Sequence, residues 1–203
     1  MNFILLKINN LLRALLSLLY EMKFFGFFTL FFPFMLYSQN NRRINLGERN
    51  MIYSETLQQE REYWISFPDS YNDKQFFKKK YPVLILFDAE DNFKLFSSVV
   101  SFMSANMQIP EMIVVGLKNI DRNKDLTPTN SLYTYEGEID KNQKTSGGGD
   151  RFLQFIDDEL FSELSEKYRI EDYRILVGHS FGGLMSIYSL FKKHQYAGIL
   201  AID

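Results

Sequence analysis

The sequence predicts an α/β fold, in which a mostly parallel sheet carries helices on both faces. Two short apolar runs, residues 83–87 and 112–115, are typical of strands buried in a parallel sheet, and a third run, 173–177, is largely apolar. Helical spacing of apolar residues separates these runs over 92–107 and 150–168. Strands that alternate with helices in this way imply right-handed crossovers and a doubly wound sheet.

Length and composition favour one globular domain. The chain has 203 residues, of which 46% are hydrophobic and 24% charged, and these fractions are ordinary for a globular protein. The formal net charge of −2 argues against a nucleic-acid-binding protein, which carries a basic surplus. The absence of cysteine excludes disulfides, thiolate metal sites and a cysteine nucleophile. Two histidines without a carboxylate cluster predict no metal site.

The N-terminal region contains a short apolar segment. Residues 24–37 are uncharged, follow Lys23 and precede Ser38, as in a secretory signal with a small residue before cleavage. The segment is shorter than the ~20 apolar residues of a membrane-spanning helix. We therefore expect residues 22–38 to be a signal peptide of an exported protein, periplasmic or secreted. An uncleaved membrane anchor and a packed helix are the alternatives.

Residues 1–21 precede Met22-Lys23, the short basic segment with which a signal peptide would begin. We expect them to be a doubtful extension, with translation beginning at Met22, or else the first half of a long, two-part leader. Residues 39–50 are polar and are expected to be a linker. The domain proper then covers residues 51–203.

The domain begins with two expected strands and ends with an expected strand. Strands are predicted over 51–61 and 62–67, where apolar and polar positions alternate in part, and a turn is predicted over 68–73. Strand 83–87 and helix 92–107 follow, and then strand 112–115. The remaining predictions are a long polar stretch, a helix, a strand, a helix and a strand, over 119–149, 150–168, 173–177, 181–195 and 197–202.

The motif Gly178-His179-Ser180-Phe181-Gly182 lies between strand 173–177 and helix 181–195. This is the Gly-x-Ser-x-Gly arrangement, in which a sharp strand-to-helix turn exposes a serine hydroxyl. Ser180 would be the nucleophile at a helix N-terminus, where free N–H groups favour developing negative charge. The backbone N–H of Phe181 is the expected first donor of an oxyanion hole.

Four segments of the chain resemble one esterase family. They are Arg61 to Pro68, Tyr81 to Asp88, the Asp-Arg-x-x-Asp-Leu-Thr-Pro run of residues 121–128, and Gly178 to Gly183. The family includes enterochelin esterases and esterase D and is a branch of the α/β-hydrolases. The resemblance covers about residues 50–203, and the Asp-Arg-x-x-Asp-Leu-Thr-Pro run is more specific than the serine motif.

The resemblance implies a serine esterase whose second oxyanion N–H comes from the loop after strand 83–87. Relatives often have Asp-Gly there, whereas this chain has Asp88-Ala89-Glu90, so Ala89 or Glu90 is the expected donor. Asp88 itself is expected to be structural. The loop over 116–130 ends at the same sheet edge, where ligands bind in such sheets.

Within that loop, Arg122 and Lys124 are candidate contacts to substrate oxygen atoms, and an internally salt-bridged or solvated loop is the alternative. The triplet Gly147-Gly148-Gly149 lacks the Gly-Lys-Ser/Thr ending of a nucleotide-binding loop. We expect a flexible loop there and no cofactor.

The partners of the serine are not evident. In this fold the acid and the histidine follow the nucleophile in the chain. His194 lies 14 positions after Ser180, about 21 Å along a helix, which is far beyond hydrogen-bond reach. His179 is expected to make local contacts, and Asp203 is a weak candidate for the acid. We expect the acid and the histidine beyond residue 203, in a longer esterase of which this chain is a fragment, inactive on its own.

Three functions follow from these expectations. The first is hydrolysis of a carboxylic ester of a small molecule or glycan, through an acyl-enzyme on Ser180. The second is a non-catalytic domain that binds a ligand without a base. The third is an acyltransferase that passes the acyl group to an alcohol. We expect no nucleic-acid partner, and a membrane contact only through an uncleaved leader.

Overall fold

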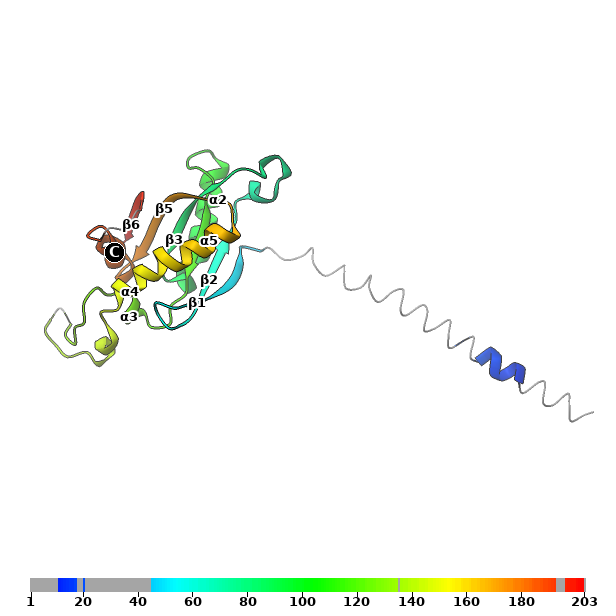
Figure 1. Ribbon diagram of the computed structural model, residues 1–203, viewed down its shortest axis with the longest axis horizontal. Coiled ribbons are helices and arrows are strands. Elements are labelled where there is room, and N and C mark those ends of the chain that lie inside the picture. The colour runs from blue at the N-terminus through cyan, green and yellow to red at the C-terminus, as the bar shows by residue number, and fades with distance from the viewer. Residues whose placement is uncertain (1–10, 18–19, 21–44, 135, 193–195, 203) are drawn as a thin grey trace, which may run out of the picture. The chain divides into compact units, whose positions relative to one another are not determined.

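The structure, a computed structural model, describes residues 11–17, 20, 45–134, 136–192 and 196–202 (Figure 1). The chain divides into two units, Met1–Asn45 and Leu46–Asp203. In the first unit, residues 11–17 form an exposed helix. The leader expected over 22–38 lies outside the described residues, as do His194 and Asp203. Within the described ranges, no helix is both long and apolar enough to cross a membrane.

One six-stranded sheet organises the second unit, in the order β1-β2-β4-β3-β5-β6. Strands β4, β3, β5 and β6 are parallel to one another, with β6 at the edge, and β2 joins β4 in antiparallel orientation. The prediction of a mostly parallel sheet is therefore confirmed. The strands are β1 (Glu48–Ser54), β2 (Gln59–Ser66), β3 (Tyr81–Leu86), β4 (Ile113–Leu117), β5 (Ile170–His179) and β6 (Gly198–Ile202).

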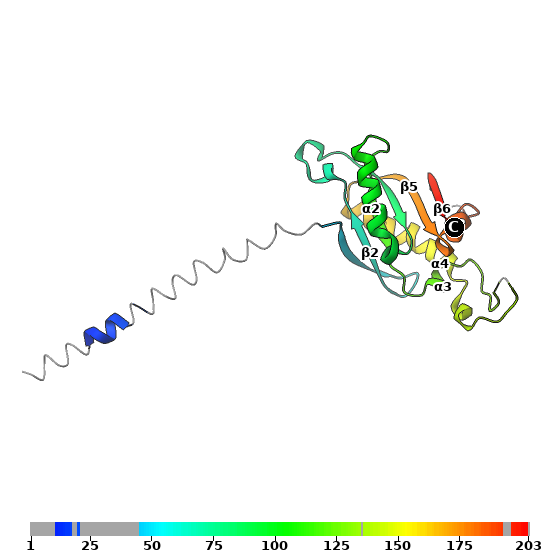
Figure 2. The ribbon, with the colours of Figure 1, turned by 180° about the vertical axis from the view of Figure 1, so that it is seen from behind.

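Helices cover both faces of this sheet. Helix α2 lies on one face and is in front of the strands in Figure 2, whereas α4 and α5 cross the other face in Figure 1. A π-helical turn, η4 (Phe155–Leu160), joins α4 to α5, so the chain runs helically from 149 to 167. The α-helices of this unit are α2 (Ala89–Ala105), α3 (Arg122–Asp125), α4 (Gly149–Gln154), α5 (Phe161–Lys167) and α6 (Phe181–Ser189).

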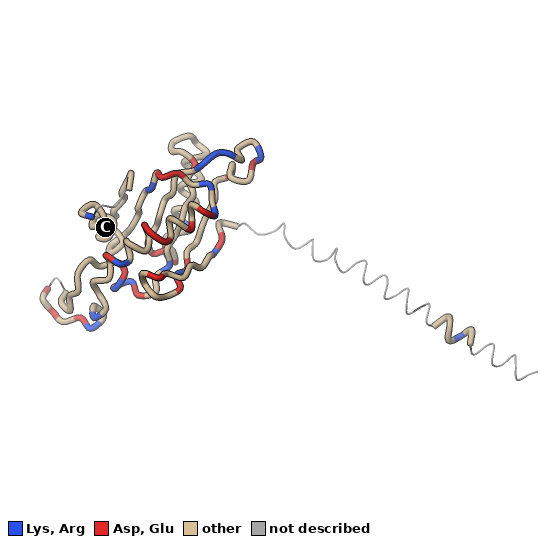
Figure 3. The backbone as a smooth tube through the Cα atoms, in the orientation of Figure 1, with Lys and Arg blue, Asp and Glu red and all other residues tan. Residues whose placement is uncertain are grey.

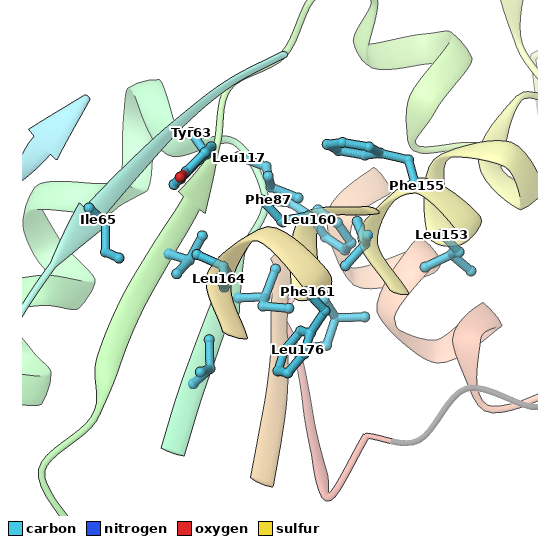
Figure 4. Close-up of a cluster of buried hydrophobic side chains, with 14 of the residues drawn as sticks. Tyr63, Ile65, Phe87, Leu117, Leu153, Phe155, Leu160, Phe161, Leu164 and Leu176 are labelled. Atoms are coloured by element: carbon cyan, nitrogen blue, oxygen red, sulfur yellow. The ribbon is translucent and has the colours of Figure 1, made fainter. Parts of the chain in front are cut away.

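Alternate side chains of the central strands fill two separate cores. Val83 and Ile85 of β3 belong to the cluster under α4, η4 and α5, whereas Leu84 and Leu86 belong to the cluster under α2. The larger cluster joins helix side chains such as Phe161 to sheet side chains from several strands (Figure 4). Burial on both faces explains why these strands are continuously apolar in the sequence.

Charged residues of both signs are interspersed over this unit (Figure 3). An exception inside the core is Arg61, whose guanidinium forms an ion pair with Asp125 at 2.7 Å, with side-chain exposures of 1% and 2%. The guanidinium also lies over the Phe152 ring, 4.9 Å from its centroid. Burial raises the pKa of Asp125, against the opposing effect of the Arg61 charge. The pair fixes β2 to the loop after β4.

Several predicted boundaries were wrong. The strands expected over 51–61 and 62–67 are β1 and β2, separated by a turn at 55–58 in which Gln58 has a φ of 55°. The expected linker 39–50 therefore ends in strand, because β1 begins at Glu48. The helix expected over 92–107 begins three residues earlier, at Ala89, and its first turn contains the acidic residues Glu90 and Asp91. The α-helix expected over 181–195 ends at Ser189.

Candidate active site

The turn between β5 and α6 places Ser180 in an unusual backbone conformation. Its φ and ψ are 56° and −119°, which non-glycine residues rarely adopt. The surroundings hold it there: the Ser180 N–H donates to the Ile202 carbonyl at 2.9 Å, and its own carbonyl accepts from Leu184 at 2.9 Å. Ser180 is exposed at this sheet edge. Strain concentrated at one exposed serine is typical of a nucleophile.

The glycines of the motif allow the strand and the helix to touch. A Cβ on Gly178 would lie 2.1 Å from the carbonyl carbon of Gly182, which no side chain can tolerate. A Cβ on Gly183 would lie 2.9 Å from the Ile202 carbonyl oxygen. The absence of a side chain at Gly178 and Gly183 therefore permits this close strand–helix approach. With the end of β5 packed against the start of α6, Ser180 lies at the tip of the turn between them.

The turn after β3 lies beside the serine turn. Strands β3 and β5 are neighbours, with Leu86 opposite Val177, and the Phe87 N–H donates to the Val177 carbonyl at 3.0 Å. A Cβ on Gly182 would be 3.2 Å from the Phe87 Cβ. The structure therefore brings the start of α6 close to the turn that precedes α2.

The backbone donors expected at this site are free within the described part of the chain. The N–H groups of Phe181, Ala89 and Glu90 lie in first turns of helices and donate to no acceptor there. Ala89 is buried, whereas the Glu90 side chain is exposed and accepts a hydrogen bond from the Asn119 N–H at 3.0 Å. Free N–H groups at helix N-termini favour an anion.

Arg122 is held by side chains of the protein itself. Its Nε donates to Asp88 Oδ1 at 2.8 Å, and its Nη2 donates to Asp88 Oδ2 at 3.1 Å and to the His179 carbonyl at 3.4 Å. The guanidinium carbon lies 5.3 Å from the centroid of the Phe181 ring. Arg122 is therefore next to the serine turn, in the internally ion-paired arrangement that was the alternative to substrate contact.

Lys124 is exposed, two residues after Arg122 on α3. Its N–H donates to Asp121 Oδ1 at 3.0 Å, and its carbonyl accepts from Gly148 at 2.8 Å. Gly147 and Gly149 donate to Thr127 Oγ1 at 2.7 Å and to the Thr127 carbonyl at 3.0 Å. The glycine triplet, expected to be a flexible loop, is instead tied to the loop after β4.

No described histidine lies where a general base is needed. His179 is exposed next to Ser180 in the chain, and only its carbonyl has a contact that bears on this site. His194 and Asp203, the other candidates, lie outside the described residues. Within the described ranges, no group of three or more His, Asp or Glu side chains is arranged to hold a metal ion.

Two apolar cavities flank β6 beside this turn. A cavity of about 400 Å³ borders Ser180 itself and also contains Leu184 and Ile187 of α6. A second cavity, of about 210 Å³, lies between β5 and α2 and contains His179 and Phe96. Ile202 of β6 borders both. Concave apolar surfaces of this kind are typical of small-molecule binding sites.

One feature of the site was missed in the sequence. Asp88, Asn119 and Arg122 form a hydrogen-bonded group, in which Asn119 Nδ2 donates to Asp88 Oδ1 at 2.6 Å. A signal did exist, because an acidic residue follows strand β3 and polar residues follow the neighbouring strand β4 at the same edge. The parallel pairing of these strands brings the two loops together.

The sheet order, the serine turn and the helices on both faces define an α/β-hydrolase fold. Residues 54–200 match the family model described as "Putative esterase". The chain belongs to this esterase family, which includes carboxylic ester hydrolases.

Two comparisons support this assignment. The chain is 30% identical over 125 residues to the ferri-bacillibactin esterase BesA of Bacillus subtilis, which covers 56% of this chain and 43% of that protein. An IroE-like serine hydrolase from Shewanella oneidensis has 34% identity and a TM-score of 0.72, over 76% of this chain and 49% of that one. The chain thus spans about half the length of these relatives.

A third likeness concerns the fold alone. The BES protein from Bacillus cereus has 22% identity and a TM-score of 0.65, over 81% of this chain and 63% of that one.

Proposed function

We propose that this chain carries the nucleophile and the oxyanion hole of a serine esterase that hydrolyses a carboxylic ester. The observation that carries the proposal is Ser180, exposed at φ 56° and ψ −119° between β5 and α6, beside free N–H groups of two neighbouring turns. A side chain held in this way can attack a carbonyl without reorganisation of the site.

In the first step, Ser180 Oγ forms a bond to the ester carbonyl carbon while its proton passes to a general base. The carbonyl oxygen becomes an oxyanion, which accepts hydrogen bonds from the N–H of Phe181 and of Ala89 or Glu90. The oxyanion then collapses, the alcohol leaves with the proton from the base, and an acyl-enzyme remains. Water, deprotonated by the same base, releases the acid and restores the serine.

We propose that the base and its acid are supplied by residues beyond 203 in a longer protein. The nucleophile precedes both partners along the chain in α/β-hydrolases, and no described residue after Ser180 is a histidine. The relatives extend well beyond the matched region, since the chain covers 43% of one and 49% of another. Lys124, which is exposed on α3, is further proposed to face the substrate's side of the site, whereas the Arg122 guanidinium is held by Asp88.

The substrate is proposed to be an ester of a small molecule. The curated relative is named a ferri-bacillibactin esterase, so this siderophore ester is the first specific substrate to test. The apolar cavity of about 400 Å³ beside Ser180 would hold part of it. We further propose that residues 22–38 export the protein, which N-terminal sequencing of the mature form would test.

The full-length protein and its Ser180→Ala variant test this function with 4-nitrophenyl acetate and with ferri-bacillibactin. We expect turnover by the wild type, and a phosphonylated Ser180 after treatment with a fluorophosphonate. Turnover that survives Ser180→Ala would refute the acyl-enzyme. Binding of ferri-bacillibactin with no turnover would point to a non-catalytic domain, and transfer of acetyl to an added alcohol in place of water would identify an acyltransferase.

A further inference from the structure

The turn after β3 is as unusual as the serine turn. Asp88 has φ and ψ of 54° and 54°, in the left-handed region, although its side chain is 5% exposed. Its carbonyl accepts from Asp91 at 3.2 Å and from Asn92 at 3.1 Å, which leaves the N–H groups of Ala89 and Glu90 pointing out of the first turn of α2. The direction of these N–H groups therefore depends on the conformation of one buried aspartate.

The Asp88 carboxylate is fixed from the loop after β4. Arg122 binds both of its oxygens, at 2.8 and 3.1 Å, and Asn119 donates to Oδ1 at 2.6 Å. A bidentate arginine fixes the plane of a carboxylate as well as its position. The Glu90 carboxylate, in the same first turn, accepts the Asn119 N–H at 3.0 Å. The whole first turn of α2 is thus tied to one loop.

Arg122 reaches the serine turn at the same time. Its Nη2 donates to the His179 carbonyl at 3.4 Å, one residue before Ser180, and the guanidinium lies over the Phe181 ring at 5.3 Å. One guanidinium thus contacts both turns that supply backbone N–H groups to the proposed oxyanion hole. These turns belong to β3 and β5, and Arg122 belongs to the loop after β4.

We propose that Asp88 and Arg122 form a clamp that holds the two halves of the oxyanion hole in register. Both are positioning residues, which act on the reaction through the N–H groups of Ala89, Glu90 and Phe181. The inference rests on the proposed esterase function. It gives Asp88 and Arg122 a role in positioning the N–H donors, in addition to any stability that their ion pair contributes. It predicts that the clamp affects stabilisation of the oxyanion more than substrate binding.

This difference is measurable because the oxyanion exists only after attack on the carbonyl. A hole with misplaced donors loses transition-state stabilisation, which lowers kcat while KM changes little. Removal of a whole oxyanion donor lowers kcat by about 10²–10³-fold. Loss of the clamp displaces donors without removing them, so we expect a decrease of roughly 10–100-fold, below that range.

The test is a double-variant cycle in the full-length protein, with 4-nitrophenyl acetate as substrate. Asp88→Asn, Arg122→Gln and the combined variant are compared by kcat, KM, the rate of inactivation by a fluorophosphonate, and Tm. We expect each single variant to lower kcat and the inactivation rate together. The combined variant should be no slower than the worse single one, because the clamp is already open.

Arg122→Lys keeps the charge but cannot bind both Asp88 oxygens and the His179 carbonyl, so its kcat should lie between the wild type and Arg122→Gln. The matched control is Arg49→Gln. Arg49 lies on β1, at the far edge of the sheet, and is ion-paired with Glu62 of β2. The kcat of this variant should equal that of the wild type.

Three results would overturn the clamp. The first is a multiplicative loss of kcat in the combined variant, which is expected if Arg122 contacts the substrate by itself. The second is a change confined to KM. The third is a decrease in kcat that is matched by partial unfolding. If Asp88→Asn fails to fold, the comparison of Arg122→Lys with Arg122→Gln still decides. The proposed function is judged separately by Ser180→Ala. If Ser180→Ala abolishes turnover and the Asp88 and Arg122 losses are multiplicative, the esterase function stands and the clamp alone is contradicted.

Discussion

Arg61 and Asp125 form an ion pair that is almost completely removed from solvent, with Nη1 and Oδ2 2.7 Å apart. Arg61 comes from β2 and Asp125 from α3, so the pair joins the sheet to the loop that carries Arg122. Arg61 Nη2 also donates to the Lys118 carbonyl at 3.3 Å. The stacking of the guanidinium on the Phe152 ring completes its surroundings. Three polar or aromatic contacts thus depend on one buried cation.

Breaking this pair is expected to destabilise the protein strongly. Asp125→Ala leaves a buried, unpaired guanidinium, and such changes lower the free energy of unfolding by about 3–5 kcal/mol. The double variant Arg61→Met/Asp125→Leu removes both charges and should be more stable than either single change. Urea unfolding of the full-length protein measures all three.

An exposed ion pair gives the control for this experiment. Lys167 contacts Glu163 at 2.9 Å on the surface of α5, and Lys167→Ala should change the free energy of unfolding by less than about 0.5 kcal/mol. Equal effects of Lys167→Ala and Asp125→Ala would contradict the importance of burial.

The backbone strain at Ser180 predicts a gain in stability when this residue is replaced by glycine. A residue held at φ 56° and ψ −119° raises the energy of the folded state by about 1–3 kcal/mol, which glycine largely avoids. Ser180→Gly and Ser180→Ala both remove the hydroxyl and should both be inactive. Ser180→Gly should nevertheless unfold at a higher urea concentration than Ser180→Ala.

A serine with ordinary helical geometry shows the opposite behaviour. Ser98 is exposed on α2, and Ser98→Gly should lower stability by about 0.5 kcal/mol, because glycine is a weaker helix former. If Ser180→Gly is less stable than Ser180→Ala, the strained conformation does not dominate the energetics of this turn.

The sequence predicted those parts of the fold that depend on local patterns. Strands β3 and β4 were recognised as continuous apolar runs, because burial on both faces leaves no charged position in them, and β5 was recognised by its largely apolar second half. The hairpin boundary was missed because the turn at 55–58 contains neither glycine nor proline, and Gln58 adopts its left-handed conformation without a sequence marker. The start of α2 was missed because Asp88 ends the apolar run with no visible cap.

The candidate site divides in the same way. Ser180 and Phe181 follow from a motif whose five residues are contiguous in the chain, so its geometry depends on local sequence. The contacts of Arg122 with Asp88 and His179 join three loops far apart in sequence, so they depend on strand order and register. Nothing in the sequence alone distinguishes an arginine that faces a substrate from one that faces an aspartate.

The glycines near the serine should differ widely in their tolerance of alanine. Gly178→Ala places a Cβ 2.1 Å from a backbone carbon of Gly182 and should prevent formation of the turn. Gly182→Ala meets only the Phe87 Cβ at 3.2 Å and should fold with a small shift. Expression as folded protein and Tm, measured for each variant, establish the order.

Gly137→Ala separates crowding from backbone conformation. Gly137 has a φ of 84° with nothing within 4 Å of the position of a Cβ, so only the left-handed conformation disfavours alanine there. The expected loss of stability is about 1 kcal/mol. A Gly178→Ala protein as stable as Gly137→Ala would show that β5 and α6 can separate without penalty.

The Glu62 carboxylate on β2 predicts a pH-dependent part of the stability. Hydrogen bonds from the Trp64 indole at 2.7 Å and from Lys118 at 3.0 Å lower its pKa, and the charges of Lys118 and Arg49 add to this effect. A carboxyl group with a lowered pKa in the folded state stabilises the protein above its ordinary value of 4.5. That stabilisation is lost as the pH falls through the lowered pKa.

The free energies of unfolding of the wild type and Glu62→Gln, measured in urea, should therefore differ most at neutral pH, where the wild type is more stable. This difference should decrease in acid. Trp64→Phe tests the cause, because it keeps an aromatic ring against Phe93 and removes the indole N–H. In the Trp64→Phe background, Glu62→Gln should have a smaller pH-dependent effect. A difference between wild type and Glu62→Gln that is the same at neutral and acid pH would show that the carboxylate contributes through packing alone.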